Sequence, residues 1–99
     1  MTKKGRRLAF RRDVFARDRH VCVMCGWPAD DAHHIIDRHE IEGGGYVAEN
    51  GISLCAGCHA KAEMEHATGR PHPGYGRTDL FRAINSSEEA ARRAARRAI

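Results

Sequence analysis

Residues 22–59 read CVMCGWPADDAHHIIDRHEIEGGGYVAENGISLCAGCH, and this stretch decides the fold. It opens with one Cys-x-x-Cys pair and closes with a second, and 29 residues separate the two pairs. Four thiolates in two such pairs form a tetrahedral sulfur set, which is typical of structural zinc. We therefore predict a structural Zn²⁺ site at Cys22, Cys25, Cys55 and Cys58. The alternative is a pair of disulfides, which a reducing compartment disfavours.

The size of the chain limits what surrounds this site. A chain of 99 residues predicts one domain, residues 1–99, whose core is too small to be secure on hydrophobic burial alone. Bound zinc would supply the missing stability. The basic start resembles that of a signal peptide, but charges interrupt the residues that follow it. No apolar run approaches the roughly 18 residues of a membrane helix, so we expect a cytoplasmic protein without a membrane partner.

Charge is distributed unevenly along the chain. Residues 1–20 hold eight Lys or Arg against two Asp, and residues 70–99 hold seven Arg against three acidic residues. Residues 21–69 hold two basic and eight acidic residues. Basic arms attract polyphosphate and an acidic centre attracts divalent cations, which together favour a nucleic-acid partner. The alternative, that the arms are solvated helix faces, stays open for the C-terminal one.

These shifts in composition predict a core, residues 21–69, between two helical arms. The N-terminal helix falls within residues 1–20, where apolar residues recur at helical spacing over residues 8–18. A Gly/Pro-rich break over residues 69–76 precedes a basic helical tail, residues 77–99.

Within the core we expect two short strands followed by a helix. Residues 32–36 and 52–54 read as strands of a hairpin whose tip is the glycine run 43–45. The helix begins near Ala56 and ends by Gly69.

The tail predicts two further helical segments. Residues 79–84 suit a short helix, and Ser86 with Glu89 matches a capping box that opens a final Ala/Arg helix. This last helix offers little apolar surface, and we expect it to be frayed until a partner binds.

The order strand, hairpin, strand, helix places a His, an Asn and a His on three successive elements, and here the chain resembles the HNH endonucleases. The matching motifs, within residues 21–67, are HHI at 33–35, ENGISLC at 49–55 and CAGCH at 55–59. The resemblance implies an α+β protein with a ββα-metal core, also called a His-Me finger, that carries a four-cysteine zinc site and flanking helices.

Roles follow from the resemblance position by position. His34 matches the general base and Asn50 the residue that aligns it. His33 and His59 match ligands of one catalytic divalent cation, and His59 also belongs to the catalytic set. Glu63, four residues further along the same helix face, is a candidate third ligand. His66 shares that face but lies about 10 Å beyond His59 along the axis, so we expect it not to reach the same metal.

Each of these residues also has a plainer interpretation. Adjacent strand residues point to opposite faces, so either His33 or His34 could be a buried, hydrogen-bonded histidine. Asn50 precedes a glycine, a pair that is common in turns. We expect structural or solvated roles for the histidines at positions 20, 39 and 72, and packing rather than base stacking for Trp27 and Tyr75.

Basic side chains are candidates for contacts with DNA phosphates. They are Lys3, Lys4, Arg6, Arg7, Arg11, Arg12 and Arg38. For Arg38 an ion pair with Asp37 or Glu40 is an equally open alternative. Contacts of this kind weaken with salt and read no sequence.

The sequence therefore predicts an HNH-type DNA endonuclease that hydrolyses phosphodiester bonds, nicking one strand at a time. The cation is Mg²⁺, Mn²⁺, Ni²⁺ or Zn²⁺, and nitrogen ligands favour the last three. One alternative is a non-catalytic zinc module that binds nucleic acid, and another is a latent subunit of a larger phage or host complex. Partners in packaging, restriction or recombination, and the oligomeric state, stay open.

Overall fold

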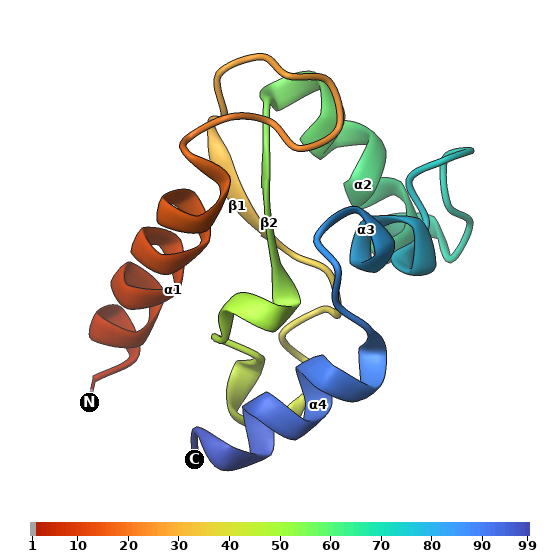
Figure 1. Cartoon of the computed structure of the whole chain (residues 1–99). Helices are drawn as coiled ribbons and strands as arrows, with labels where there is room; N and C mark the ends of the chain where they lie inside the picture. Colours follow the sequence, from red (N-terminus) through yellow and green to blue (C-terminus); the bar gives the residue numbers. More distant parts are fainter. Residues whose placement is uncertain (1) are drawn as a thin grey trace.

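The computed structural model describes residues 2–99 and has an α+β fold (Figure 1). Its elements follow the order α1 (Lys3–Asp18), β1 (Asp31–His34), η1 (Glu42–Gly44), η2 (Ala48–Asn50), β2 (Gly51–Leu54), α2 (Ala56–Thr68), α3 (Arg77–Ala83) and α4 (Glu88–Arg97). None of the helices in this described part of the chain is long and apolar enough to cross a bilayer.

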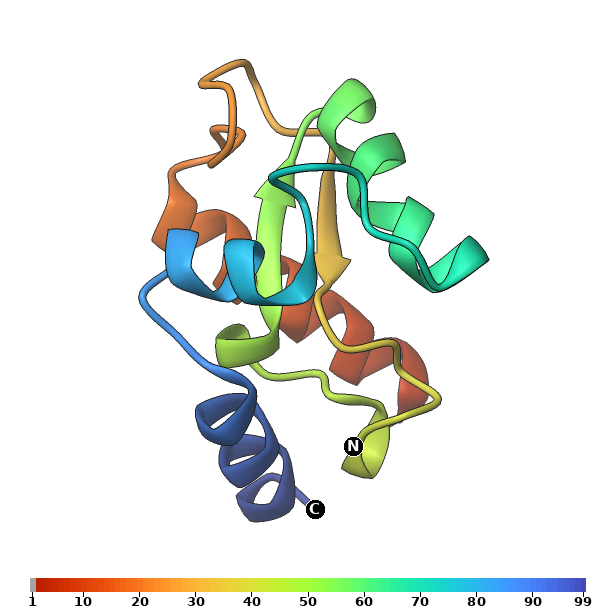
Figure 2. The ribbon, with the colours of Figure 1, turned by 90° about the vertical axis from the view of Figure 1, so that its right-hand side faces the viewer.

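A two-stranded antiparallel sheet lies at the centre, and helices cover both of its faces. The register pairs Asp31 with Leu54 and His34 with Gly51. Figures 1 and 2 show α1 on one side of the strands and α2 on the other. The first strand ends at His34, two residues before the predicted end, because a side chain from the loop before β2 binds the backbone of Ile36.

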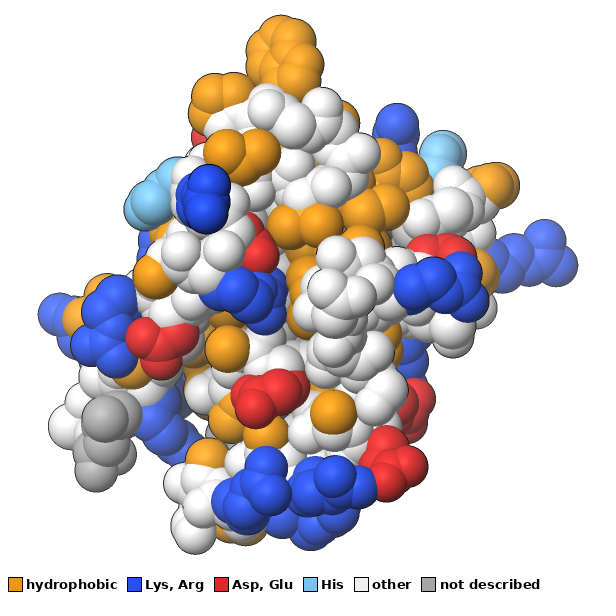
Figure 3. Space-filling model, in the orientation of Figure 1, with side chains coloured by type: hydrophobic (Ala, Val, Ile, Leu, Met, Phe, Trp, Pro, Cys, Tyr) orange, Lys and Arg blue, Asp and Glu red, His pale blue; other side chains and the backbone are white. Residues whose placement is uncertain are grey.

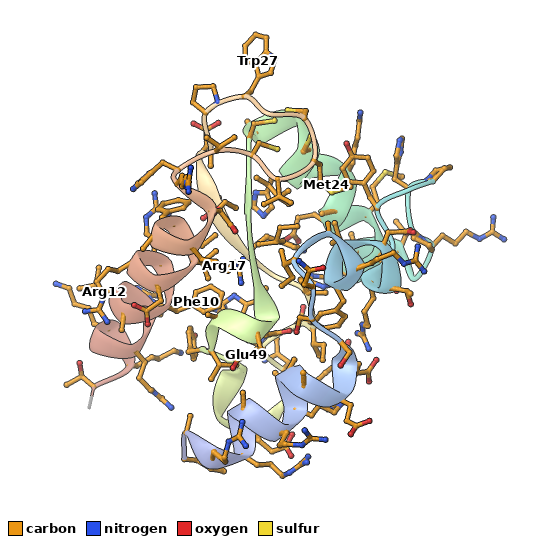
Figure 4. The ribbon with its side chains drawn as sticks, in the orientation of Figure 1. Phe10, Arg12, Arg17, Met24, Trp27 and Glu49 are labelled. Carbon is orange, nitrogen blue, oxygen red and sulfur yellow. The ribbon has the colours of Figure 1, made fainter. Side chains whose placement is uncertain are left out.

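Helix α1 begins five residues before the predicted start. Thr2 caps it, since its Oγ1 accepts a hydrogen bond from the backbone N–H of Gly5 at 2.9 Å. The buried face consists of Phe10, Val14 and Phe15, the apolar positions that repeat in the sequence. Phe10 points from α1 toward the strands (Figure 4).

Gly51 allows α1 to lie directly against the sheet. A Cβ atom at this position would lie 2.4 Å from Cγ2 of Val14 and 2.7 Å from the ring of Phe10. Only a residue without a side chain permits this approach. Asn50-Gly51 is therefore the junction of η2 and β2, and it brings a helix close to the strands.

The loop between the strands is more ordered than a glycine hairpin tip. The glycines at 43–45 all have positive φ, and they form η1 and its C-cap, which pack against α4. Such φ values favour glycine. The predicted hairpin tip thus contains a short helix, and this loop is a packing surface for α4.

Helix α4 also differs from the expectation. It begins after Ser87, whose Oγ accepts from the backbone N–H of Ala90 at 3.0 Å, whereas Ser86 donates to the backbone oxygen of Glu49. The predicted capping box at Ser86 and Glu89 is therefore one residue out of place. Ala91 and its neighbours at 94 and 95 are buried, so the helix packs by small side chains that allow close approach.

Helix α2 starts at Ala56, capped by the sulfur of Cys55, and ends before Gly69, which has a φ of 77°. Helix α3 starts two residues earlier than predicted, because Asp79 accepts a hydrogen bond from the N–H of Gly76 at 3.1 Å. One buried cluster joins strands, loop and C-terminal helices. Its larger members are Ile35, Ile36, Ile41, Ile52, Leu54, Leu80 and Phe81.

Candidate active site

The four cysteines come together at the end of the sheet where α2 begins. Their sulfur atoms all lie within 4.8 Å of one another, and all four thiols are free. Cys25 Sγ and Cys55 Sγ are 3.5 Å apart. Two pairs from distant parts of the chain thus form one tetradentate sulfur cluster rather than two separate disulfides, and this donor set fits a structural zinc ion.

The backbone holds the first cysteine pair against β2. The N–H of Val23 donates to the oxygen of Ser53 at 3.0 Å, and the N–H of Gly26 donates to the oxygen of Cys22 at 2.9 Å. Burial opposes ionisation of Cys22, but backbone hydrogen bonds at Cys55, Cys25 and Met24 outweigh it and lower the pKa of this thiol to about 7. A thiol that ionises near neutral pH suits metal binding.

His33 and His34 point to opposite faces of β1, as strand geometry requires. His33 is buried on the α2 side. The His34 ring lies on the α1 side, stacked on Phe10 at 4.3 Å between ring centroids and edge-on to Tyr46 at 4.9 Å. Its Nε2 is buried and has no hydrogen-bond partner among residues 2–99.

Asn50 fixes the segment that follows these histidines. Its Oδ1 accepts from the backbone N–H of Ile36 at 2.9 Å. Its Nδ2 donates to the backbone oxygens of Ile36 at 3.1 Å and Gly45 at 3.2 Å. The side chain is fully buried, so these bonds anchor the loop just beyond His34 to the loop before β2.

On the α2 side, Glu63 lies at the centre of a histidine cluster. Its Oε1 is 3.1 Å from Nδ1 of His33 and 3.2 Å from Nε2 of His59. Nδ1 of His59 lies 3.4 Å from Oδ2 of Asp31 on β1. Glu63 thus lies against both predicted histidine ligands, and two imidazoles with a carboxylate fit a divalent transition metal. Among residues 2–99, however, the group whose ligand atoms all lie within 4.8 Å of one another does not include His59.

His66 belongs to the same cluster, contrary to the expectation. Ligand atoms of His33, Glu63 and His66 all lie within 4.8 Å of one another. His59 and His66 are separated along the axis of α2, but Glu63 lies between them on the same helix. A cation beside Glu63 is therefore within reach of His66. The signal available in the sequence was the i, i+3 spacing of Glu63 and His66.

Two hollows meet at His34. The first, of about 350 Å³, opens over the histidine cluster and is lined by residues that include His33, Glu63 and His66. The second, of about 310 Å³, lies toward α1. Residues shared by both linings are Asp31, Ala32, His34 and Arg38. His34 therefore faces a continuous surface that joins the ligand cluster to the basic helix.

Comparison with protein families agrees with this arrangement. The model of the family described as HNH endonuclease matches residues 22–65. Residues 22–65 are thus similar to the HNH endonuclease family. This match includes both cysteine pairs and the His34, Asn50 and His59 positions, and the helices α1, α3 and α4 lie outside it. Searches of curated proteins and of solved structures found no match.

Burial keeps both strand histidines neutral at pH 7. Burial, followed by the charges of His59 and His66, lowers the pKa of His33 to about 3. Burial, followed by the charge of Arg38, lowers the pKa of His34 to about 4. A neutral imidazole can bind a cation or accept a proton.

The basic residues predicted to contact DNA divide into two groups. Within residues 2–99, Lys3, Lys4, Arg7 and Arg38 make no ion pair, so neither pairing considered for Arg38 is formed. Arg11 and Arg12 pair with Asp31 and Asp13. Arg6 is half-buried and donates to the oxygen of Gly43 at 3.4 Å, which indicates a structural role.

Several arginines of the C-terminal arm form ion pairs, either within the arm or with η1. Arg92 and Arg93 pair with Glu88 and Glu89, and Arg96 pairs with Glu42. In the orientation of Figure 3, basic side chains follow α1 along one edge and α4 along the bottom, with acidic side chains next to those of α4. Arg12 points away from the strands, whereas Arg17 points toward them (Figure 4).

The remaining aromatic and histidine side chains lie outside the ligand cluster. Trp27 is 72% exposed and points away from the molecule at the tip of the first cysteine pair (Figure 4). The Tyr75 hydroxyl lies 3.3 Å from Cys58 Sγ, so this ring packs against the sulfur cluster. His20 packs on Phe15, and His72 lies edge-on to Tyr75.

Proposed function

We propose that this chain is a metal-dependent endonuclease that hydrolyses DNA phosphodiester bonds, with His34 as the general base. The observation that carries the proposal is the placement of His33 and His34. One side chain enters a cluster of potential metal ligands, and its neighbour lines the adjoining hollow and has a buried ring nitrogen without a partner among residues 2–99. A zinc module that only binds nucleic acid has no need for this pair.

His34 is prepared to remove a proton from a water molecule. The ring is held between Phe10 and Tyr46, which leaves Nε2 without a partner among residues 2–99. Its low pKa keeps the ring neutral, so that one ring nitrogen has a lone pair that can accept a proton. A phosphate anion in the hollow would raise the pKa of His34, since a nearby negative charge favours the protonated ring. Substrate binding would thereby make His34 a stronger base.

His33, His59 and Glu63 would hold the catalytic cation. Such an ion, when bound, neutralises charge on a phosphate group and on the leaving oxygen. Asp31 Oδ2 lies 3.4 Å from Nδ1 of His59 and would orient this ring, so that Nε2, which lies next to Glu63, is directed at the ion. Asn50 acts as a positioning residue through the loop beyond β1.

The sulfur cluster would hold a separate structural zinc. All four ligand positions of a tetrahedral ion are then taken by cysteine, so this site has no place for substrate. One active site cuts one strand at a time, and we therefore expect nicked products from a single encounter.

The DNA backbone would approach over the surface that α1 shares with β1. Arg7, Arg11 and Arg38 line the hollow next to His34, and Lys3 and Lys4 extend the basic surface. We expect Lys3→Gln, Lys4→Gln and Arg7→Gln together to lower the salt dependence of binding, by about 0.9 in log–log slope for each phosphate that the variant no longer neutralises. The matched control changes three paired arginines, at 92, 93 and 96, to Gln. An equal decrease in the control would contradict binding along α1.

The deciding experiment uses supercoiled plasmid with the wild type, His34→Ala and the control His72→Ala. Each protein is first shown to retain one zinc. We expect nicking that requires added Mg²⁺, Mn²⁺ or Ni²⁺, and a loss of about 10²–10⁴-fold in His34→Ala because a general base contributes that much. Salt-sensitive binding without cleavage by the wild type would favour a binding module or a latent subunit.

A further inference from the structure

The far end of α2 holds a histidine whose tautomer the structure defines. Nε2 of His66 lies 3.0 Å from the backbone oxygen of Ile35. A carbonyl oxygen only accepts, so Nε2 must carry the proton and donate it. In the neutral ring the lone pair is then on Nδ1.

That lone pair faces two carboxylates. Nδ1 of His66 is 3.7 Å from Oδ2 of Asp37 and 3.8 Å from Oε2 of Glu63, both longer than a hydrogen bond. The His66 side chain is only 13% exposed, so water does not screen these groups fully. Two carboxylates and a lone pair directed at one space form a site that a positive charge would stabilise. The charge is either a second proton on the ring or a bound cation.

The surrounding side chains favour a cation. His59 likewise lies next to two carboxylates, because its Nδ1 faces Asp31 and its Nε2 faces Glu63. The rings of His33 and His66 are stacked with centroids 5.1 Å apart, and Nδ1 of His33 also faces Glu63. Metal-ligating histidines characteristically donate their other N–H to a carbonyl or carboxylate. His66 does so through the oxygen of Ile35, and Nδ1 of His59 lies 3.4 Å from Asp31.

We infer that His66 is a further ligand of the catalytic cation, through Nδ1, and that the Ile35 carbonyl orients it. This inference rests on the cation site of the proposed function. The donor set becomes three imidazoles and one carboxylate. Imidazole suits Zn²⁺, Ni²⁺ and other first-row transition metals, whereas Mg²⁺ prefers oxygen. The site is thus selective for a transition-metal ion.

Metal affinity tests this without reference to cleavage. Protein with zinc in the sulfur cluster is titrated calorimetrically with Mn²⁺ and with Mg²⁺, as wild type, His66→Ala and the control His72→Ala. We expect tighter binding of Mn²⁺ than of Mg²⁺. His66→Ala should weaken Mn²⁺ by about 10–100-fold or more, because loss of an orienting group alone has that effect. Unchanged Mn²⁺ affinity in a folded His66→Ala protein would overturn the inference.

A measurement on the wild type guards against a variant that fails to fold. ¹⁵N spectra of the histidine rings are recorded before and after a second equivalent of Zn²⁺. Coordination predicts a shift of the His66 Nδ1 resonance together with those of His33 and His59. Shifts confined to the resonances of His33 and His59 would overturn the role of His66. If Mn²⁺ binding requires His66 but the protein does not nick plasmid, the nuclease activity is refuted and the metal site is retained. If His66→Ala changes neither nicking nor Mn²⁺ affinity, the role of His66 is refuted and the nuclease activity is retained.

Discussion

The sulfur cluster and the histidine cluster share one helix but differ in almost every other respect. Cys58 and His59 are neighbours at the start of α2, yet they serve different sites. Successive helical residues are rotated by about 100°, so adjacent side chains point in different directions. The sulfur cluster uses soft ligands and closes on itself, whereas the histidine cluster opens into a hollow. A metal ion in the sulfur cluster can thus fix the start of α2. Helix α2 in turn positions ligands of a metal ion in the histidine cluster.

The largest expected effect is a difference in folding stability between a variant of the sulfur cluster and a variant of the histidine cluster. Cys22→Ser should abolish folding, because binding of a structural zinc supplies about 10–16 kcal/mol and small domains have only about 5–15 kcal/mol in total. His59→Ala should remain folded with one zinc. Circular dichroism and metal analysis of both proteins test this. A folded, zinc-free Cys22→Ser protein would remove the reason for treating the clusters as different.

The second prediction concerns Asn50, which anchors the segment that follows His33 and His34. Asn50→Ala removes three buried hydrogen bonds, and we expect it to lower the free energy of unfolding by about 2–5 kcal/mol, as for other buried polar networks. Nicking should fall as well, while the zinc content stays at one. Ser86→Ala, which removes one exposed bond to the same loop, is the control and should cost under about 1 kcal/mol. Denaturant unfolding measures both, and equal losses would contradict the anchoring role.

The third prediction tests the contact of α1 with the strands near His34. Gly51→Ala places a methyl group against Val14 and Phe10 and should destabilise by about 1–3 kcal/mol, a typical overpacking cost. Gly57→Ala in α2 meets nothing within 4 Å and should be neutral or stabilising by up to about 1 kcal/mol. Thermal unfolding compares the two variants. A stable Gly51→Ala protein would show that α1 can shift without cost.

The smallest effect involves Asp18, which joins α1 to β2 near the sulfur cluster. Burial opposes its ionisation, but Arg17 and the Ser53 N–H outweigh burial and hold the pKa of Asp18 below its ordinary value of 3.8. Its carboxylate accepts from the Ser53 N–H at 3.0 Å. Asp18→Asn should destabilise by about 1–2 kcal/mol at pH 7, in the range of hydrogen bonds to charged groups.

The sign of the pH dependence follows from the lowered pKa. The stabilising contribution of Asp18 is present above pH 3.8 and is lost as the pH falls through the pKa of the folded state. The difference in free energy of unfolding between the wild type and Asp18→Asn should therefore decrease only in strong acid. Asp13→Asn, on the exposed side of the same helix, is the control. A gap that closes already near pH 6, about two units above the ordinary pKa of Asp, would point to a different group.

Much of the scaffold was predictable because local signals and tertiary packing agree. The cysteine spacing indicated the sulfur cluster, and the apolar repeat of Phe10, Val14 and Phe15 indicated the buried face of α1. Predictions failed where packing outweighed local preference. Helix α4 buries alanines that a hydrophobicity count barely registers, and the glycine loop became a surface for it.

Sequence alone determined which residue types are available as ligands, their spacing and the resemblance to the HNH endonucleases, since these depend on residue identity and short-range periodicity. Only the tertiary structure decided that His66 joins His33 and Glu63, that Arg7 and Arg38 are unpaired within residues 2–99 while the arginines of α4 are paired, and that α1 bounds the hollow beside His34. The physical reason is that contacts between α2, the strands and α1 join residues far apart in the chain, and no local pattern encodes the direction in which a side chain meets a distant partner.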